Sequence, residues 1–157
     1  MLIYRAGDVT TPVANGPAII AQVCNDSGVW EGGLTTALSA RWPEPERAYL
    51  KWYEDRLWEE EPFGLGALQT VRVGPLLQVS SIVAEHGLLP HEGVPPIRYG
   101  ALETALHKLL RVALKDNSSI HIPRIGTGSA GGDWARIERL LAKMLHPVEL
   151  NIYDFPT

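Results

Sequence analysis

The apolar residues of this chain fall into two patterns, which alternate along the sequence. Short continuous apolar runs are typical of strands covered on both faces of a sheet. They occupy residues 18–24, 119–123 and 148–153. Stripes with the i, i+3, i+4, i+7 spacing predict helices over residues 102–113 and 137–145. Weaker signals predict an edge strand over 2–4 and short helices over 34–42 and 45–53.

The middle of the chain has a different organisation. Residues 68–73 and 76–84 form two predicted strands joined by a Gly-Pro break, which indicates an antiparallel hairpin. Residues 58–63, with an acidic run, and the proline-rich residues 88–96 are expected to be loops. The predicted fold class is therefore α/β: a three-layer α/β/α sandwich with a central mixed, mostly parallel sheet, in a single domain over 1–157.

Glycines are concentrated in two stretches, Asn25–Leu34 and Pro123–Trp134, and each stretch links a predicted strand to a predicted helix. This arrangement creates an anion site, because backbone N–H groups point outward and the helix dipole favours negative charge. One such loop is a weak signal, since glycine also serves ordinary turns. Two in one small domain predict a ligand with two phosphates, or with a phosphate and a sugar, held between them.

Composition narrows the class of partner. The net charge of −4 argues against a broad surface for duplex nucleic acid, although a pocket could still recognise one nucleotide. Cys24 is the only cysteine, so neither an internal disulfide nor a thiolate metal cluster is expected, and a reducing cytoplasm is the simplest location. Neither a signal peptide nor an apolar stretch of the ~18 residues that span a membrane is present. We expect a cytoplasmic monomer without a membrane partner.

The histidines give no sign of a metal site. Metal-ligating histidines and cysteines recur at characteristic short spacings. That spacing is absent among His91, His107, His121 and His146. The sequence therefore predicts no metal and no cofactor.

Asp8 follows the first predicted strand. A carboxylate there more often caps a turn, but it can also accept a hydrogen bond from an exocyclic amine such as that of adenine. The combination of Asp8, the two glycine loops and the order of strands and helices resembles the macrodomain, an ADP-ribose-binding fold. The matching stretches are Asp26–Gly28, Gly32–Leu38, Ile82–Ala84, Pro123–Gly126, Arg139–Leu141 and Ile152–Pro156. The chain resembles in particular the macrodomain of a chromatin remodeller named for its amplification in liver cancer, and more distantly the terminal ADP-ribose glycohydrolase.

The resemblance implies a role in binding for several residues. Asp8, with the Val9 backbone beside it, matches the aspartate that binds the adenine amine. Tyr153 and Phe155 are candidates to stack on adenine, with plain core packing as the alternative. The loop whose N–H groups hold the diphosphate matches Gly126, Thr127, Gly128, Ser129, Ala130 and Gly131. The loop around the distal ribose matches Asn25, Asp26, Gly32, Gly33 and Leu34.

Catalysis is harder to place. The glycohydrolase branch uses a lysine where this chain has Glu85 and His86, so a covalent lysine intermediate is not expected. The remodeller branch has glutamine in place of Glu85, and a glutamate can deprotonate a water that a glutamine can only orient. We expect Glu85 to activate a water that attacks C1″, His86 to shuttle protons, and Asp26 to orient the ribose. The alternative is that Glu85 and His86 are solvated side chains at the end of a strand, without a catalytic role. Asp133 fits a helix N-cap better than a catalytic role.

Three functions remain open on the sequence. The chain could hydrolyse ADP-ribose from protein side chains or nucleobases, could read terminal ADP-ribose without turnover, or could remove phosphate from ADP-ribose 1″-phosphate. A reader must pass its recognition to an effector, usually a fused domain, and the sequence shows none. This consideration favours hydrolysis, with ADP-ribosylated protein or nucleic acid as the partner.

Overall fold

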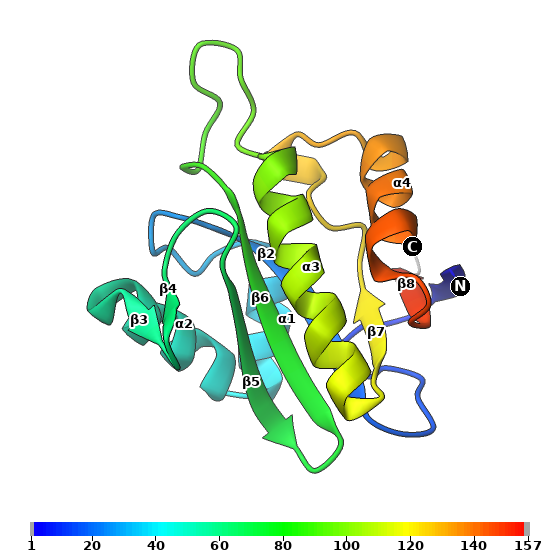
Figure 1. Ribbon diagram of the computed structural model, residues 1–157. Helices are drawn as coiled ribbons and strands as arrows, with labels where there is room; N and C mark the ends of the chain where they lie inside the picture. Colours follow the sequence, from blue (N-terminus) through cyan, green and yellow to red (C-terminus); the bar gives the residue numbers. More distant parts are fainter. Residues whose placement is uncertain (1, 156–157) are drawn as a thin grey trace.

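The structure is a computed structural model, and it describes residues 2–155 (Figure 1). Its main sheet has six strands in the order β1-β8-β7-β2-β6-β5. β5 pairs with β6 in the antiparallel sense, and every other neighbouring pair is parallel. The strands are β1 (Leu2–Ala6), β2 (Ala18–Asn25), β5 (Leu68–Gly74), β6 (Leu77–Glu85), β7 (Ser119–Ile122) and β8 (Leu150–Asp154).

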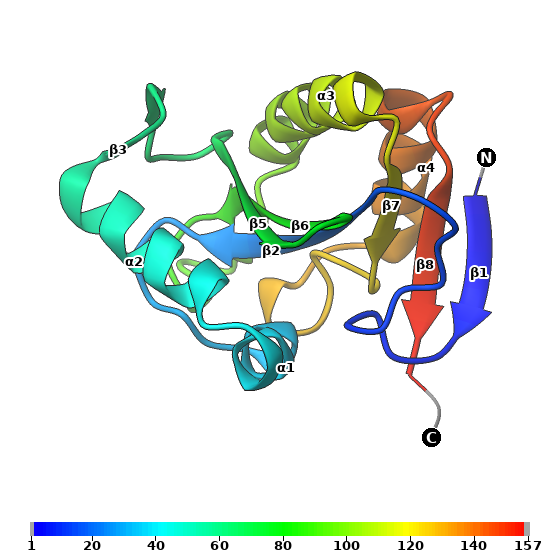
Figure 2. The same cartoon turned by 90° about the horizontal axis from the view of Figure 1, so that it is seen from below.

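Two pairs of helices cover the two faces of this sheet. α3 and α4 lie on one face and α1 and α2 on the other (Figure 2). Their bounds are Gly33–Arg41 for α1, Glu44–Asp55 for α2, Tyr99–Asp116 for α3 and Trp134–Leu145 for α4. The predicted three-layer sandwich with a mixed sheet is confirmed. None of the helices in the described range has the length and hydropathy needed to cross a membrane.

The continuous apolar run of β2 reflects its position between the two helical layers. Successive side chains of a strand point to opposite faces. Accordingly, Ile19 and Ala21 pack in the core under α3 and α4, whereas Ile20 packs with Leu38 of α1. Both faces are buried, so neither set of positions tolerates polar side chains over most of the strand.

The segment expected to be an acidic surface loop contains a small hairpin instead. β3 (Leu57–Trp58) pairs antiparallel with β4 (Glu61–Pro62). Glu61 is held in place because Trp52 Nε1 donates to its carbonyl oxygen (2.9 Å) and Lys108 Nζ pairs with its carboxylate (2.6 Å). Part of the acidic run therefore belongs to a strand, and Lys108 of α3, which is distant in sequence, holds it in place.

The parallel strands bring the functional loops to one end of the sheet. β2, β6 and β7 all end at this edge, so the segments 26–32, 86–98 and 123–133 leave the sheet there. Ligands of open α/β sheets bind beyond the carboxyl ends of their strands. The segment after β6 projects beyond the rest of the molecule at the top of Figure 1. Pro156, which closes the last family-like stretch, lies outside the described residues.

Candidate functional site

Two adjoining cavities lie between the ends of the strands and the start of α1. The first, of about 420 Å³, is bounded by Asp8, Val9, Tyr153 and Phe155; we call it the Tyr153 cavity. The second, of about 200 Å³, lies between the two glycine loops; we call it the Glu85 cavity. Gly33, Leu34 and Pro123 line both. The cavities therefore form one cleft, whose size is typical of small-molecule sites.

In the Tyr153 cavity one carboxylate oxygen of Asp8 is hydrogen-bonded within the protein and the other is not. Its Oδ1 accepts hydrogen bonds from the Thr10 N–H (2.9 Å) and the Thr10 hydroxyl (2.7 Å). These bonds lower the pKa of Asp8, so the carboxylate is ionised at neutral pH. Within the described residues Oδ2 has no hydrogen-bond partner, which leaves one anionic acceptor at the cavity.

The two aromatic side chains of this cavity differ in burial and in hydrogen bonding. Tyr153 is only 4% exposed, and its hydroxyl accepts from the Val13 N–H (2.9 Å) and bonds His121 Nδ1 (2.7 Å). Burial lowers the pKa of His121 to about 4, so the imidazole is neutral and its contact with Tyr153 is a hydrogen bond between two uncharged groups. Phe155 is 73% exposed. Tyr153 is thus a fixed wall, whereas Phe155 is a rim side chain able to close over a flat ligand.

The second glycine loop divides into residues that face the cleft and residues that shape it. Gly126, Thr127 and Ser129 line the Glu85 cavity, as do Gly32 and Gly33 of the first loop. The remaining members of the predicted diphosphate loop do not line it. They are Gly128, whose carbonyl accepts from the Gly131 N–H (3.0 Å), Ala130, which is buried, and Gly131, which packs on Pro95.

Glu85 is the last residue of β6 and lines the Glu85 cavity. The residue is half-buried, and burial raises the pKa of its carboxyl to about 7. Desolvation has this effect because it disfavours the charged form. A carboxyl that titrates near neutral pH in a ligand-sized cavity is suited to exchange protons with a reacting group.

Three other predicted site residues do not line the cleft. Asp26 binds its own surroundings: its Oδ2 contacts His86 Nδ1 (2.8 Å) and its Oδ1 accepts from the Gly87 N–H (2.8 Å). Partial burial opposes ionisation of Asp26, but these hydrogen bonds outweigh it and lower its pKa. The Asn25 amide is engaged within its own loop, bonded to the backbone of Ser27 and Val29. Asn25, Asp26 and His86 are therefore not among the residues that line the two cavities.

Arg124 lines the cleft, although it is not among the site residues predicted from the sequence. Its guanidinium makes two hydrogen bonds to the Asp154 carboxylate (2.7 and 3.0 Å), and it lies 5.2 Å from the ring centres of Tyr4 and Trp134. It is the only cation lining the cleft within the described residues, beside the glycine loop. Fixed guanidinium groups suit phosphate, because their planar donors match its geometry.

Asp133 has the capping role that the sequence favoured. Its side chain accepts from the Ala135 N–H (3.2 Å) at the start of α4, which confirms the N-cap. In the described part of the chain, no three His, Cys, Asp or Glu side chains gather in a way that could hold a metal ion. The charged side chains that line the cleft are therefore those of Asp8, Glu31, Glu85 and Arg124, of which Glu31 is exposed.

The fold and its glycine-edged cleft define a class of α/β ligand-binding domain, and comparison with known proteins identifies the family. A macrodomain protein from Streptomyces coelicolor is 40% identical, with 98% of this chain and 99% of that chain covered and a TM-score of 0.85. The chain belongs to the macrodomain family. No family model matches it.

Two other proteins are similar to this chain over most of its length. Chromodomain-helicase-DNA-binding protein 1-like from Mus musculus is 35% identical over an alignment that covers 98% of this chain and 18% of that protein. The chain thus spans less than a fifth of the length of the curated relatives it matches. Thermosipho africanus DarTG, solved in complex with ADP-ribose, shares the fold at 15% identity, with a TM-score of 0.67 and coverage of 89% and 38% of the two chains.

The raised pKa of Glu85 predicts a pH-dependent cost in stability. Its folded pKa of about 7 lies above the ordinary 4.5. The stability that depends on a protonated Glu85 carboxyl is therefore fully present below pH 4.5 and is lost as the pH rises through 7. Glu85→Gln removes the ionised form. After allowance for solvent screening, we expect the variant to be more stable than the wild type by about 2 kcal/mol at pH 8 and nearly equal at pH 4. Urea unfolding at both pH values measures this difference.

The matched control is Glu31→Gln, because Glu31 lines the same cavity but is exposed. It should leave the free energy of unfolding unchanged at either pH. Equal stability of Glu85→Gln and the wild type at pH 8 would mean that water solvates the Glu85 carboxylate fully.

Proposed function

We propose that the chain binds ADP-ribose in the cleft and hydrolyses the bond between ADP-ribose and a modified macromolecule. One observation carries the proposal: a single cleft leads from a free carboxylate oxygen and an exposed aromatic side chain, past glycine backbone, to a carboxyl with a pKa near 7. Family membership and the ADP-ribose complex of Thermosipho africanus DarTG support the choice of ligand.

The Tyr153 cavity suits the adenosine end of the ligand. Asp8 Oδ2 is a charged acceptor for the adenine amine, and charge-assisted hydrogen bonds are stronger than neutral ones. Phe155 covers the base from the rim, while Tyr153 forms the wall. In this pose the diphosphate passes Gly33 and reaches the N–H groups around Gly126.

The Glu85 cavity then receives the distal ribose. Water attacks C1″, and the Glu85 carboxylate accepts a proton as the new C–O bond forms. The bond from C1″ to the macromolecule breaks with its electron pair passing to the leaving group, which takes up a proton from solvent while Glu85 releases its own to solvent. The products are ADP-ribose and the unmodified acceptor. Holding the ligand at three points presents C1″ in one pose, which lowers the entropic part of the barrier.

Asp26 is assigned a positioning role in this proposal. Its carboxylate fixes His86 and Gly87, the two residues that follow Glu85, and its N–H donates to the Glu85 carbonyl oxygen (2.9 Å). Asp26 thereby anchors the end of β6. The side chain of His86 in this contact is largely exposed.

Two measurements test the proposed function. Calorimetry with free ADP-ribose should show saturable binding. A panel of ADP-ribosylated proteins, ADP-ribosylated oligonucleotides and ADP-ribose 1″-phosphate, assayed for product release, should show release of ADP-ribose from at least one conjugate. Binding without release would establish a reader, and release of phosphate alone would establish a phosphatase. An absence of binding would overturn the assignment of the cleft.

A further inference from the structure

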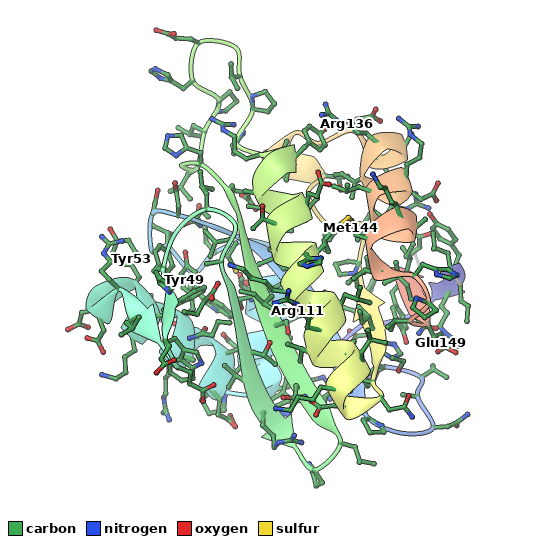
Figure 3. The ribbon with its side chains drawn as sticks, viewed as in Figure 1. Tyr49, Tyr53, Arg111, Arg136, Met144 and Glu149 are labelled. Carbon is green, nitrogen blue, oxygen red and sulfur yellow. The ribbon has the colours of Figure 1, made fainter. Side chains whose placement is uncertain are left out.

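A basic groove runs between α3 and α4, on the face of the sheet opposite α1 and α2 (Figures 1 and 2). It consists of two adjoining hollows of about 430 and 440 Å³, which share Gly100 and Glu103. We call it the α3–α4 groove. Figure 3 shows Arg111 on α3, Arg136 near the start of α4 and Met144 between the two helices. The cations that line the groove are Lys108, Arg111, Arg136, Arg139 and Lys143.

Most of this positive charge is uncompensated. Lys108 pairs with Glu61, but the other four cations have no ion-pair partner among the described residues. Among the residues that the structure describes, Glu103 is the only acidic one that lines the groove. The whole chain has a net charge of −4, so the groove reverses the sign of the protein locally. Concentrated positive charge on an acidic protein points to an anionic partner.

The spacing of the α4 cations suits a chain of anionic groups rather than a single one. Arg136, Arg139 and Lys143 follow one another at intervals of three and four residues, so they share one face of α4 over about 10 Å. The Arg136 guanidinium lies 3.7 Å from the centre of the Tyr99 ring, which orients its planar donors. Guanidinium groups held in this way bind phosphate well.

Two structural links connect the residues of the groove with those of the cleft. The Tyr99 hydroxyl, at the upper end of the groove, accepts from the Asp133 N–H (2.9 Å), where the second glycine loop ends. The segment 86–97 leaves Glu85, projects outward, and returns next to Tyr99 (Figure 1). We call it the projecting loop. It exposes Leu89 (78%) and Val94 (51%) to solvent.

We propose that the α3–α4 groove binds the phosphate backbone of a single-stranded nucleic acid, whose ADP-ribosylated nucleotide enters the cleft. The inference rests on the proposed function and names its substrate class. A nucleic acid strand uses both features, because its phosphates match the row of cations and its bases give the projecting loop apolar surface to contact. An acidic peptide would use the cations alone. A single strand also fits one narrow groove better than a duplex does, and its bases are already exposed for chemistry.

Fluorescence anisotropy with an unmodified, labelled single-stranded DNA of twelve nucleotides, over a series of KCl concentrations, tests the groove. The double variant Arg139→Glu/Lys143→Glu should bind about 10-fold more weakly or worse, and its log–log salt slope should fall by about 1.4, because two phosphate contacts are lost. Leu89→Ser should weaken binding without changing that slope. The control is Arg47→Glu/Lys51→Glu, which makes the same charge change with the same spacing on exposed residues of α2.

The outcomes separate this proposal from the proposed function. Loss of DNA binding in the groove variant alone, with wild-type calorimetry for ADP-ribose, supports the groove. Equal losses in the groove variant and the α2 control, or no binding by the wild type, overturn it. An oligoglutamate peptide that binds as tightly as DNA and depends on the same two residues also overturns it. A wild-type protein that binds DNA at the groove but does not bind ADP-ribose overturns the proposed function instead.

Discussion

Gly33→Val is expected to weaken ADP-ribose binding about 100-fold or more, a loss of about 2.7 kcal/mol, while leaving the stability of the free protein almost unchanged. Gly33 lines both cavities, at the point where they join. A Cβ atom built there meets no atom within 4 Å, and the residue has no left-handed φ angle to maintain. The valine side chain therefore fits the free fold and occupies the space that the diphosphate needs.

The control for this variant is Gly100→Val. Gly100 also lies in the first turn of a helix, α3, and a Cβ atom there likewise meets nothing within 4 Å. It lies on the α3–α4 side, outside the cleft. Calorimetry and thermal unfolding of both variants measure the two effects. Wild-type affinity in Gly33→Val would show that ADP-ribose binds elsewhere.

Other glycines of the two loops would give a less informative experiment. A Cβ atom on Gly126 would lie 2.8 Å from Ile137, and one on Gly28 would lie 2.4 Å from the Tyr53 ring. Both residues also have positive φ angles, so a substitution strains the backbone in the free protein. A loss of binding in those variants would not distinguish a blocked cleft from a damaged fold.

The layers of the fold could be predicted because burial on two faces leaves a strong pattern. The unbroken apolar run of β2 indicates a central parallel strand, and the Gly-Pro break between β5 and β6 indicates the antiparallel pair that the structure confirms. The cap at Asp133 is also a local signal, since a side chain and an N–H two residues apart decide it. Patterns of this kind depend on neighbours in the sequence.

The orientation of side chains within the loops could not be predicted in the same way. Asn25 bonds its own loop because Tyr49 and the backbone around Val29 surround it, and residue type alone does not distinguish this from a ligand contact. Arg124 is fixed in the cleft by Asp154 and Tyr4, which lie 30 and 120 positions away. Such contacts arise only once the sheet has assembled.

The largest catalytic effect is expected at Glu85. Glu85→Gln should lower kcat for ADP-ribose release about 1,000-fold, within the range for loss of a general base, and should change ADP-ribose affinity little. Glutamine retains the shape and the hydrogen-bonding length of the side chain but cannot accept a proton from water. Single-turnover release from the conjugate that the panel identifies, together with calorimetry on the same protein, separates the two effects.

The pH dependence of the wild type provides an independent measure of the same group. The base must be ionised, and burial sets its pKa at about 7. Turnover should therefore rise about tenfold per pH unit below 7 and level off above it, the opposite of the effect on stability. Glu31→Gln, in the same cavity, should retain both the rate and the profile. A Glu85→Gln variant with wild-type turnover, or a rate that falls as the pH rises to 7, would show that another group activates the water.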